Sequence, residues 1–156
     1  MTYFILKYLH VIGAAVLLGT GAGIAFFMLL GHLTGKPVIV GAIARMVVVA
    51  DFLFTATAVL AQPVTGIALA WYMGWSLWEG WIALSICLYL VTGAFWLPVV
   101  WMQMRMRDLA AAAAAAGEPL PPIYHTLFRW WFACGFPAFA SVLAIFWLMI
   151  AKPQPW

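Results

Sequence analysis

The chain has 156 residues, of which 68% are hydrophobic and only 7% are charged. About a quarter of the residues in a water-soluble domain are charged, so this composition excludes a soluble globular domain. The formal charge of +3 comes from basic residues beside apolar segments, which indicates membrane topology rather than nucleic-acid binding. The length allows one domain, most of which four membrane spans of roughly 20 to 28 residues would occupy.

Four long apolar segments follow one another and predict an all-α, integral-membrane four-helix bundle, a single domain over residues 1–156. We expect its helices at about 3–30, 43–72, 81–104 and 124–150. The apolar run after Lys7 resembles a signal peptide, but it continues to about Leu30, so we interpret it as a retained first span.

Two features are expected to modify these helices. Pro63, inside the second segment, predicts a kink, because proline removes one backbone hydrogen bond. The alanine run after Asp108 predicts that the third helix continues beyond the bilayer, until the proline-rich piece at 119–122 stops it.

Basic residues are distributed unevenly between the two ends of the predicted bundle. One end, with its flanks, carries Lys36, Arg45, Arg105, Arg107 and Arg129, and the other carries only Lys7 and Lys152. Because positive residues favour the cytoplasmic side, both termini are expected on the non-cytoplasmic side of a bacterial inner membrane. The tryptophans around the second connection predict an aromatic belt at that outer interface: Trp71, Trp75, Trp78 and Trp81.

Polar residues inside the predicted spans are the main functional signal, because each ionisable side chain at depth is costly. They are Lys7, His10, Asp51, Gln62, Gln103, His125 and Arg129. Asp51 and Arg129 are expected at nearly the same depth, which predicts an ion pair, with Thr55 one turn beyond Asp51. Such a pair would be a structural clasp between helices, or Asp51 would be a proton-relay carboxylate or a substrate counter-charge.

His10 lies roughly 10 Å below the outer surface, on a helix face that Gly13 and Gly21 make thin. Such a face admits another helix or a flat ring, so His10 is either a hydrogen-bonded core residue or the axial ligand of a haem. Gln62, Met73 and Met149 lie at a suitable depth for a second ligand, and a five-coordinate haem is the alternative. His32 and His125 would form a second site at the inner side or would simply be solvated.

Residues Leu6 to Gly13 read L-K-Y-L-H-V-I-G, a pattern that resembles the first span of HemJ-type protoporphyrinogen oxidase and of CopD-like membrane proteins. The HemJ resemblance implies haem b on His10. Nearly the whole chain is similar to a bacterial family of predicted integral-membrane proteins, domain of unknown function 2269. That similarity rests on the stretches VADFLFT, QPVTG, WLPVVW and FRWWF, which begin at Val49, Gln62, Trp96 and Phe128.

Three functions follow as expectations. The first is a small membrane protein that binds haem b through His10 and acts in redox or electron transfer, with Asp51 handling protons together with Arg129 or His125. The second is a non-catalytic accessory or assembly subunit, within a homo-oligomer or a larger membrane complex. The third is a small transporter or metal-handling protein. No nucleophile–base pair, phosphate-binding loop or pair of catalytic carboxylates is apparent, which argues against hydrolases and kinases.

Overall fold

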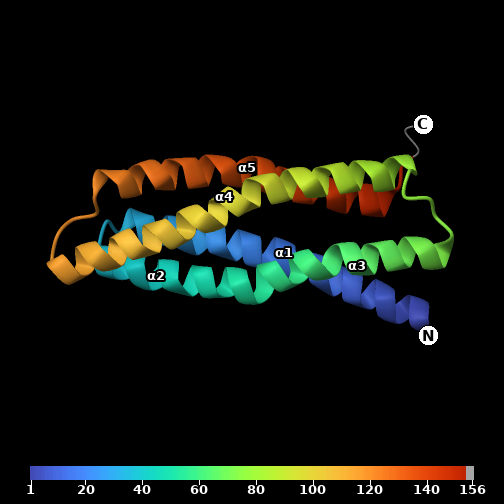
Figure 1. The fold of residues 1–156 in the computed structure, drawn as a ribbon, viewed down its shortest axis with the longest axis horizontal. Helices are drawn as coiled ribbons and strands as arrows, with labels where there is room; N and C mark the ends of the chain where they lie inside the picture. The colour runs from blue at the N-terminus through green and yellow to red at the C-terminus, as the bar shows by residue number, and fades with distance from the viewer. Residues whose placement is uncertain (154–156) are drawn as a thin grey trace.

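The computed structural model describes residues 1–153 and contains only helices and their connections. They are α1 (Thr2–Leu33), α2 (Pro37–Ala50), the π-helical turn η1 (Asp51–Thr55), α3 (Ala56–Met73), α4 (Gly80–Ala116) and α5 (Pro122–Ala151) (Figure 1). Elements α2, η1 and α3 form one continuous helical span, Pro37–Met73. The described residues therefore contain 4 helices long and apolar enough to cross a membrane, which confirms the predicted fold class.

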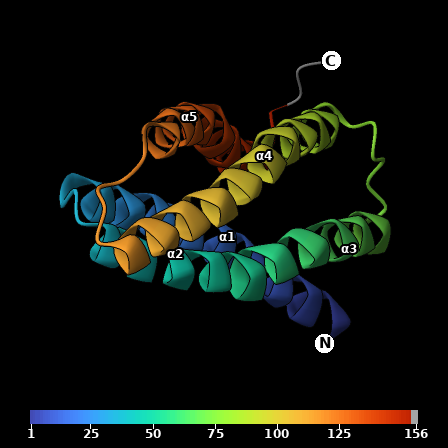
Figure 2. The same ribbon diagram turned by 60° about the vertical axis from the view of Figure 1, so that its left-hand side comes forward.

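The start of α1, the end of α5 and the α3–α4 connection lie at one end of the bundle, called the terminal end below (Figure 1). The α1–α2 and α4–α5 connections lie at the other, called the opposite end. Helix α1 packs along the span of α2, η1 and α3, and α4 packs along α5. The α3 side and the α4–α5 pair diverge toward the terminal end, as Figures 1 and 2 both show.

Proline and glycine set several helix boundaries. Proline occupies the first helical position of α2 and of α5, where no partner is needed for its missing N–H. Gly74 ends α3 with φ 69°, and Gly117 ends α4 with φ 68°, left-handed conformations that glycine adopts without strain. Helix α4 runs through the alanine segment as the sequence predicts, and Gly117 stops it before the prolines.

The irregularity in the second span lies away from its proline. Helix α3 continues through Pro63 in α-helical form, and the change of helix type occurs upstream, over Asp51–Thr55. In a π-helical turn one extra residue is accommodated, which redirects the side chains that it carries. The sequence predicted a kink at Pro63, but the irregular turn begins at the buried Asp51.

The two ends of the bundle are packed differently. At the opposite end, a large apolar core joins all four spans: Ile24, Met28, Val40, Ala44, Val47, Met102, Met106, Ala110, Leu120, Tyr124, Phe128 and Trp131. At the terminal end the core is small and consists of Ala70, Trp81, Ile82 and Leu148. Only 4% of the surface of Trp81 is exposed, so this tryptophan is a core residue and not part of a lipid-facing belt.

The ammonium group of Lys152 packs on two tryptophan rings beside the terminal-end core. The Nζ atom of Lys152 lies 4.4 Å from the ring centroid of Trp75 and 5.5 Å from that of Trp81. Trp71 and Trp78 point outward instead, with 88% and 84% of their surfaces exposed. The predicted tryptophan group thus divides into two residues that pack with Lys152 and two that face the surroundings.

Helices α1 and α3 approach each other closely at two glycines. A Cβ atom on Gly13 would overlap Nε2 of Gln62, and a Cβ atom on Gly66 would lie 3.1 Å from Cε1 of His10. Gln62 donates from that same nitrogen to the backbone oxygen of His10 at 2.8 Å. The thin face of α1 near His10 and Gly13 is therefore occupied by α3.

This contact predicts that Gly13→Ala lowers the free energy of unfolding relative to Gly19→Ala by about 1–3 kcal/mol, because the buried Gln62 amide loses its acceptor. Both substitutions add the same helix propensity, and no atom lies within 4 Å of a Cβ on Gly19. Unfolding in mixed detergent micelles measures the difference. Equal stability of the two variants would contradict the α1–α3 contact.

Candidate functional site

A hydrogen-bonded polar cluster, the Asp51 cluster, lies in the interior where η1, α4 and α5 meet. Only 2% of Asp51 is exposed, and its Oδ1 accepts a hydrogen bond from Nε1 of Trp96 at 3.2 Å. Gln103 is oriented so that both of its polar atoms are satisfied: Nε2 donates to Oδ2 of Asp51 at 2.8 Å, and Oε1 accepts from Nε1 of Trp131 at 3.2 Å. Thr55, buried in the same π-helical turn as Asp51, completes the cluster.

Helical spacing explains how these residues meet. Trp96 and Gln103 are seven residues apart on α4, which places them on one face two turns from each other, so each reaches a different oxygen of the same carboxyl group. Asp51 and Thr55 are the first and last residues of η1, and both side chains point inward. The π-helical turn thus brings a carboxyl and a hydroxyl group together in the interior.

The carboxyl group of Asp51 receives only neutral donors. The one ion pair among residues 1–153 joins Arg107 to Asp108 at the surface, and Arg129 is exposed. The predicted Asp51–Arg129 ion pair is therefore wrong. Equal depth on two helices does not ensure contact, because on α5 the side chain that turns toward Asp51 is Trp131, through Gln103.

The hydroxyl group of Thr55 has an unusual environment. Only 6% of the residue is exposed, and its Oγ1 atom has no hydrogen-bond partner. By contrast, the exposed Thr57 donates to the backbone oxygens of Leu53 and Phe54 in the ordinary helical manner. A buried hydroxyl without a partner is costly, which marks Thr55 as a place where a proton or a water molecule can be received.

A second polar cluster, the His10 cluster, joins α1 to α3 and consists of His10, Gln62 and Thr65. Nδ1 of the half-buried His10 lies 2.9 Å from Oγ1 of Thr65. Oγ1 of Thr65 lies 2.8 Å from the backbone oxygen of Ala61, to which its hydroxyl hydrogen is donated. Since that hydrogen is used, Thr65 must accept from Nδ1–H of His10, so the neutral imidazole has its lone pair on Nε2.

The other predicted site residues are dispersed. Lys7 is exposed, with Nζ 5.6 Å from the ring centroid of Tyr3. Met73 is 41% exposed at the end of α3, and Met149 packs against the terminal-end core. Gly13 contacts Gln62 and not an open face. None of these positions forms a common site with His10 in the part of the chain that the structure describes.

The two predicted inner histidines do meet at the opposite end. The ring centroids of His32 and His125 are 5.7 Å apart. His32 stacks on Phe128 at 3.6 Å, and its Nδ1 lies 3.3 Å from the hydroxyl oxygen of Tyr124. This contact joins α1 to α5 at the opposite end.

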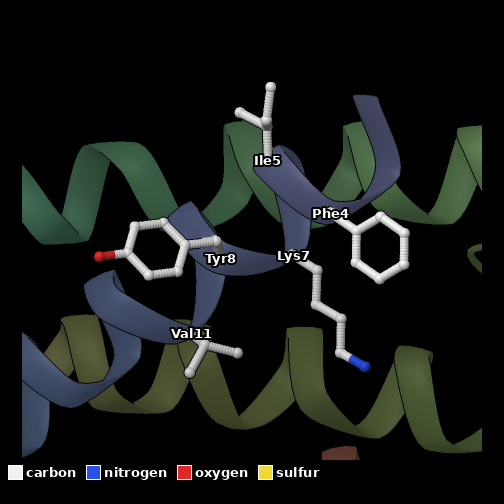
Figure 3. Close-up of a pocket in the computed structure, with 5 residues that line it drawn as sticks. All are labelled: Phe4, Ile5, Lys7, Tyr8 and Val11. Carbon is white, nitrogen blue, oxygen red and sulfur yellow. The ribbon is translucent and has the colours of Figure 1, made fainter. Parts of the chain in front are cut away.

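Two shallow hollows lie on the outer surface of the bundle. One is formed by α1 alone, from Phe4, Ile5, Lys7, Tyr8 and Val11, whose side chains project from a single helix in Figure 3. The other is formed by α2 and η1, between Ala42 and Phe54. Neither includes Asp51 or a residue of the His10 cluster.

Comparison with known proteins identifies the chain at the level of a family. Residues 4–153 match the family model described as a predicted integral membrane protein, DUF2269. The chain belongs to this family. No curated protein and no solved structure matches it. It is therefore a multi-pass integral membrane protein, in agreement with the apolar spans and the outward-facing hydrophobic side chains.

The sequence analysis did not assemble the Asp51 cluster of this DUF2269 protein. Gln103 was recognised as polar at depth but was not paired, and Trp96 and Trp131 were not assigned to a site. A usable signal existed, because Trp96 and Gln103 are spaced two turns apart and an indole N–H needs a partner when buried.

The Asp51–Gln103–Trp131 chain predicts a specific rescue. In Asp51→Asn, the new amide N–H group faces the N–H group of Gln103, so two donors oppose each other. Turning the Gln103 amide around relieves this clash but places its N–H group against the indole N–H group of Trp131. In Gln103→Glu, two carboxyl groups face each other. In the double variant Asp51→Asn/Gln103→Glu the amide donates to the new carboxylate, which also accepts from Trp131.

Each single substitution should therefore lower the free energy of unfolding by about 1–3 kcal/mol. The double variant should lose clearly less than the sum of the two single losses, because its hydrogen bonds are restored. Unfolding of all four proteins in mixed micelles gives the coupling energy. Simple additivity would show that Gln103 does not bridge Asp51 and Trp131.

Proposed function

We propose that this integral membrane protein takes up and releases a proton at Asp51 within the membrane. The proposal rests on one observation: a carboxyl group that is 2% exposed accepts hydrogen bonds from an indole and an amide, and no cation contacts it. An ionised aspartate at the centre of a span costs about 2.5–3.5 kcal/mol, and membrane proteins retain such residues mainly for ion or proton pathways.

The Asp51 cluster can accommodate both protonation states. When the carboxylate is ionised, the N–H groups of Trp96 and Gln103 supply a donor to each oxygen. When it is protonated, it gains one O–H donor, for which the unpartnered Oγ1 of Thr55 is an acceptor on the same π-helical turn. Thr55 therefore offers an acceptor for the protonated form on the same element that carries Asp51.

Chemical labelling tests the proposal. Dicyclohexylcarbodiimide enters bilayers and adds to protonated carboxyl groups, and Asp51 is the interior member of the four acidic residues. We expect the labelling rate of Asp51 in detergent-solubilised protein to fall as the pH rises, by up to tenfold per pH unit above the titration range. Peptide mass mapping identifies the label, and Asp51→Asn is the control. Labelling that is independent of pH would exclude proton exchange.

A second candidate function, haem b binding at His10 in electron transfer, is supported by the His10 cluster. A hydrogen bond from Nδ1–H to an oxygen is the usual outer-shell arrangement of a metal-ligating histidine, and here it leaves Nε2 with its lone pair. The fit is limited to that nitrogen, because Gln62 of α3 occupies the face of α1 at Gly13, and the His10 ring lies against Gly66 of α3. Haem would supply a one-electron couple, and this chain would hold the imidazole in the required tautomer.

The haem candidate predicts a Soret band in protein expressed with added haem, absent from His10→Ala and retained in His125→Ala, a histidine at the opposite end. Thr65→Val should weaken haem affinity on the order of 10–100-fold, because the outer-shell acceptor is lost. Spectral titration with haemin measures the affinity. A colourless wild-type protein, or equal spectra for both histidine variants, would exclude this candidate.

A further inference from the structure

Building on proton exchange at Asp51, we propose that the proton reaches this carboxyl group from the terminal end alone, by way of Thr55. The transfer moves a proton from a hydronium ion in this path to a carboxylate oxygen, leaving water behind. No electron moves, and release is the reverse step. The proposal assigns a direction to a site that is otherwise symmetric between the two aqueous phases.

The first support is what lies one helical turn from the cluster on the terminal side. Thr55, with its unpartnered hydroxyl, follows Asp51 by four residues, and Gly135 follows Trp131 by four. Gly93 precedes Trp96 by three residues on α4, which runs in the other direction. No atom lies within 4 Å of a Cβ built on either half-buried glycine, apart from the neighbouring helical backbone.

The two glycines are therefore not packed against side chains of neighbouring helices on the terminal side of the cluster, where Thr55 has a hydroxyl that needs a partner. A buried polar atom without a protein partner is a position at which an ordered water molecule binds. Helical neighbours at three or four residues lie on the same face, so Thr55 is directly adjacent to Asp51.

The second support is the distribution of buried polar side chains. Toward the terminal end, the described residues bury Thr55, Gln62, Ser85 and Ser141. Toward the opposite end they bury Gln103 and the hydroxyl group of Tyr124, and both are engaged in hydrogen bonds. Gln62 and Ser85 are engaged as well. Among the described residues, the buried side-chain atom without a partner is Oγ1 of Thr55, and it lies on the terminal side of Asp51.

The third support is the apolar core at the opposite end. Met28, Met106 and Tyr124 are each at most 1% exposed, and they fill the bundle between the Asp51 cluster and that end. The buried hydroxyl of Tyr124 is engaged by His32 at the outer edge of this core. A dry, close-packed core excludes water, so it blocks protons from that side.

No charged side chain competes for the proton near Asp51. Its contacts come from Trp96 and Gln103 on α4 and from Thr55 on its own element, while α5 contributes Trp131 through Gln103. Arg45 on α2, six residues before Asp51, is exposed, and so are Arg105 on α4 and Arg129 on α5. On α1, His10 is bonded to α3, and His32 stacks on Phe128 at the opposite end. On α4, the hydroxyl group of Tyr89 donates to the backbone oxygen of Val59 on α3.

Vesicles with different pH inside and outside test the direction. Full-length protein carrying a cleavable tag after Trp156 is reconstituted into liposomes, and external protease identifies molecules with the terminal end outside. Labelling of Asp51 by dicyclohexylcarbodiimide is then measured by peptide mass mapping, with internal and external pH varied separately. Gramicidin, which equalises the two pH values, provides the control.

In molecules with the terminal end outside, the labelling rate should follow external pH, by up to tenfold per pH unit, and ignore internal pH. Inverted molecules should follow internal pH. Dependence on the pH at the opposite end, or on both, would overturn the direction and leave proton exchange at Asp51 intact. Dependence on neither, with or without gramicidin, would overturn proton exchange itself.

A matched pair of variants tests the path. Thr55→Val removes the unpartnered hydroxyl, and Thr57→Val removes a hydroxyl on the exposed face two residues away. After protons are released from a caged compound at the terminal end, the infrared band of protonated Asp51, assigned with Asp51→Asn, should rise about fivefold more slowly in Thr55→Val, the equivalent of one lost hydrogen bond. Thr57→Val should match the wild type. Equal rates in the two variants would exclude Thr55 from the path.

Discussion

The interior of this membrane protein is organised around the hydrogen bonds of one carboxyl group. A charged or polar side chain in a bilayer must find partners within the protein, because lipid offers none. Asp51 meets this constraint through Trp96 and Gln103, and Gln103 in turn engages Trp131. The second, third and fourth spans are thereby joined at one depth by directional contacts, in a fold that is otherwise held by apolar packing.

The local backbone is adapted to the same constraint. A regular α-helix through Asp51 and Thr55 would already place the two residues on neighbouring positions of one face, and the π-helical turn widens the helix there by one residue. The turn leaves the Thr55 hydroxyl without the backbone acceptor that Thr57 uses. An irregular turn beside an unpartnered polar group is a combination that folding alone disfavours, and it is typical of functional positions.

The sequence predicted the fold better than the contacts within it. Apolar segment lengths gave four spans, and Gly117 with the following prolines gave the end of the long α4, because these signals are local. The partner of Asp51 was predicted incorrectly, since charge and depth favoured Arg129 while the rotation of α5 turns Trp131 inward instead. Rotation of a helix about its axis depends on packing against its neighbours, and the apolar pattern of a membrane span, which is hydrophobic on all sides, does not report it.

The donor set around Asp51 also limits what the carboxyl group can bind. Trp96 and Gln103 both turn N–H groups toward its oxygens, so their positive ends occupy the directions from which a metal cation would approach. A proton differs from every other cation in this respect, because it becomes part of an O–H group and converts an acceptor into a donor. Thr55 is the neighbour whose free oxygen can receive that new donor. The contacts that stabilise the buried carboxylate therefore support the proposal that its ligand is a proton.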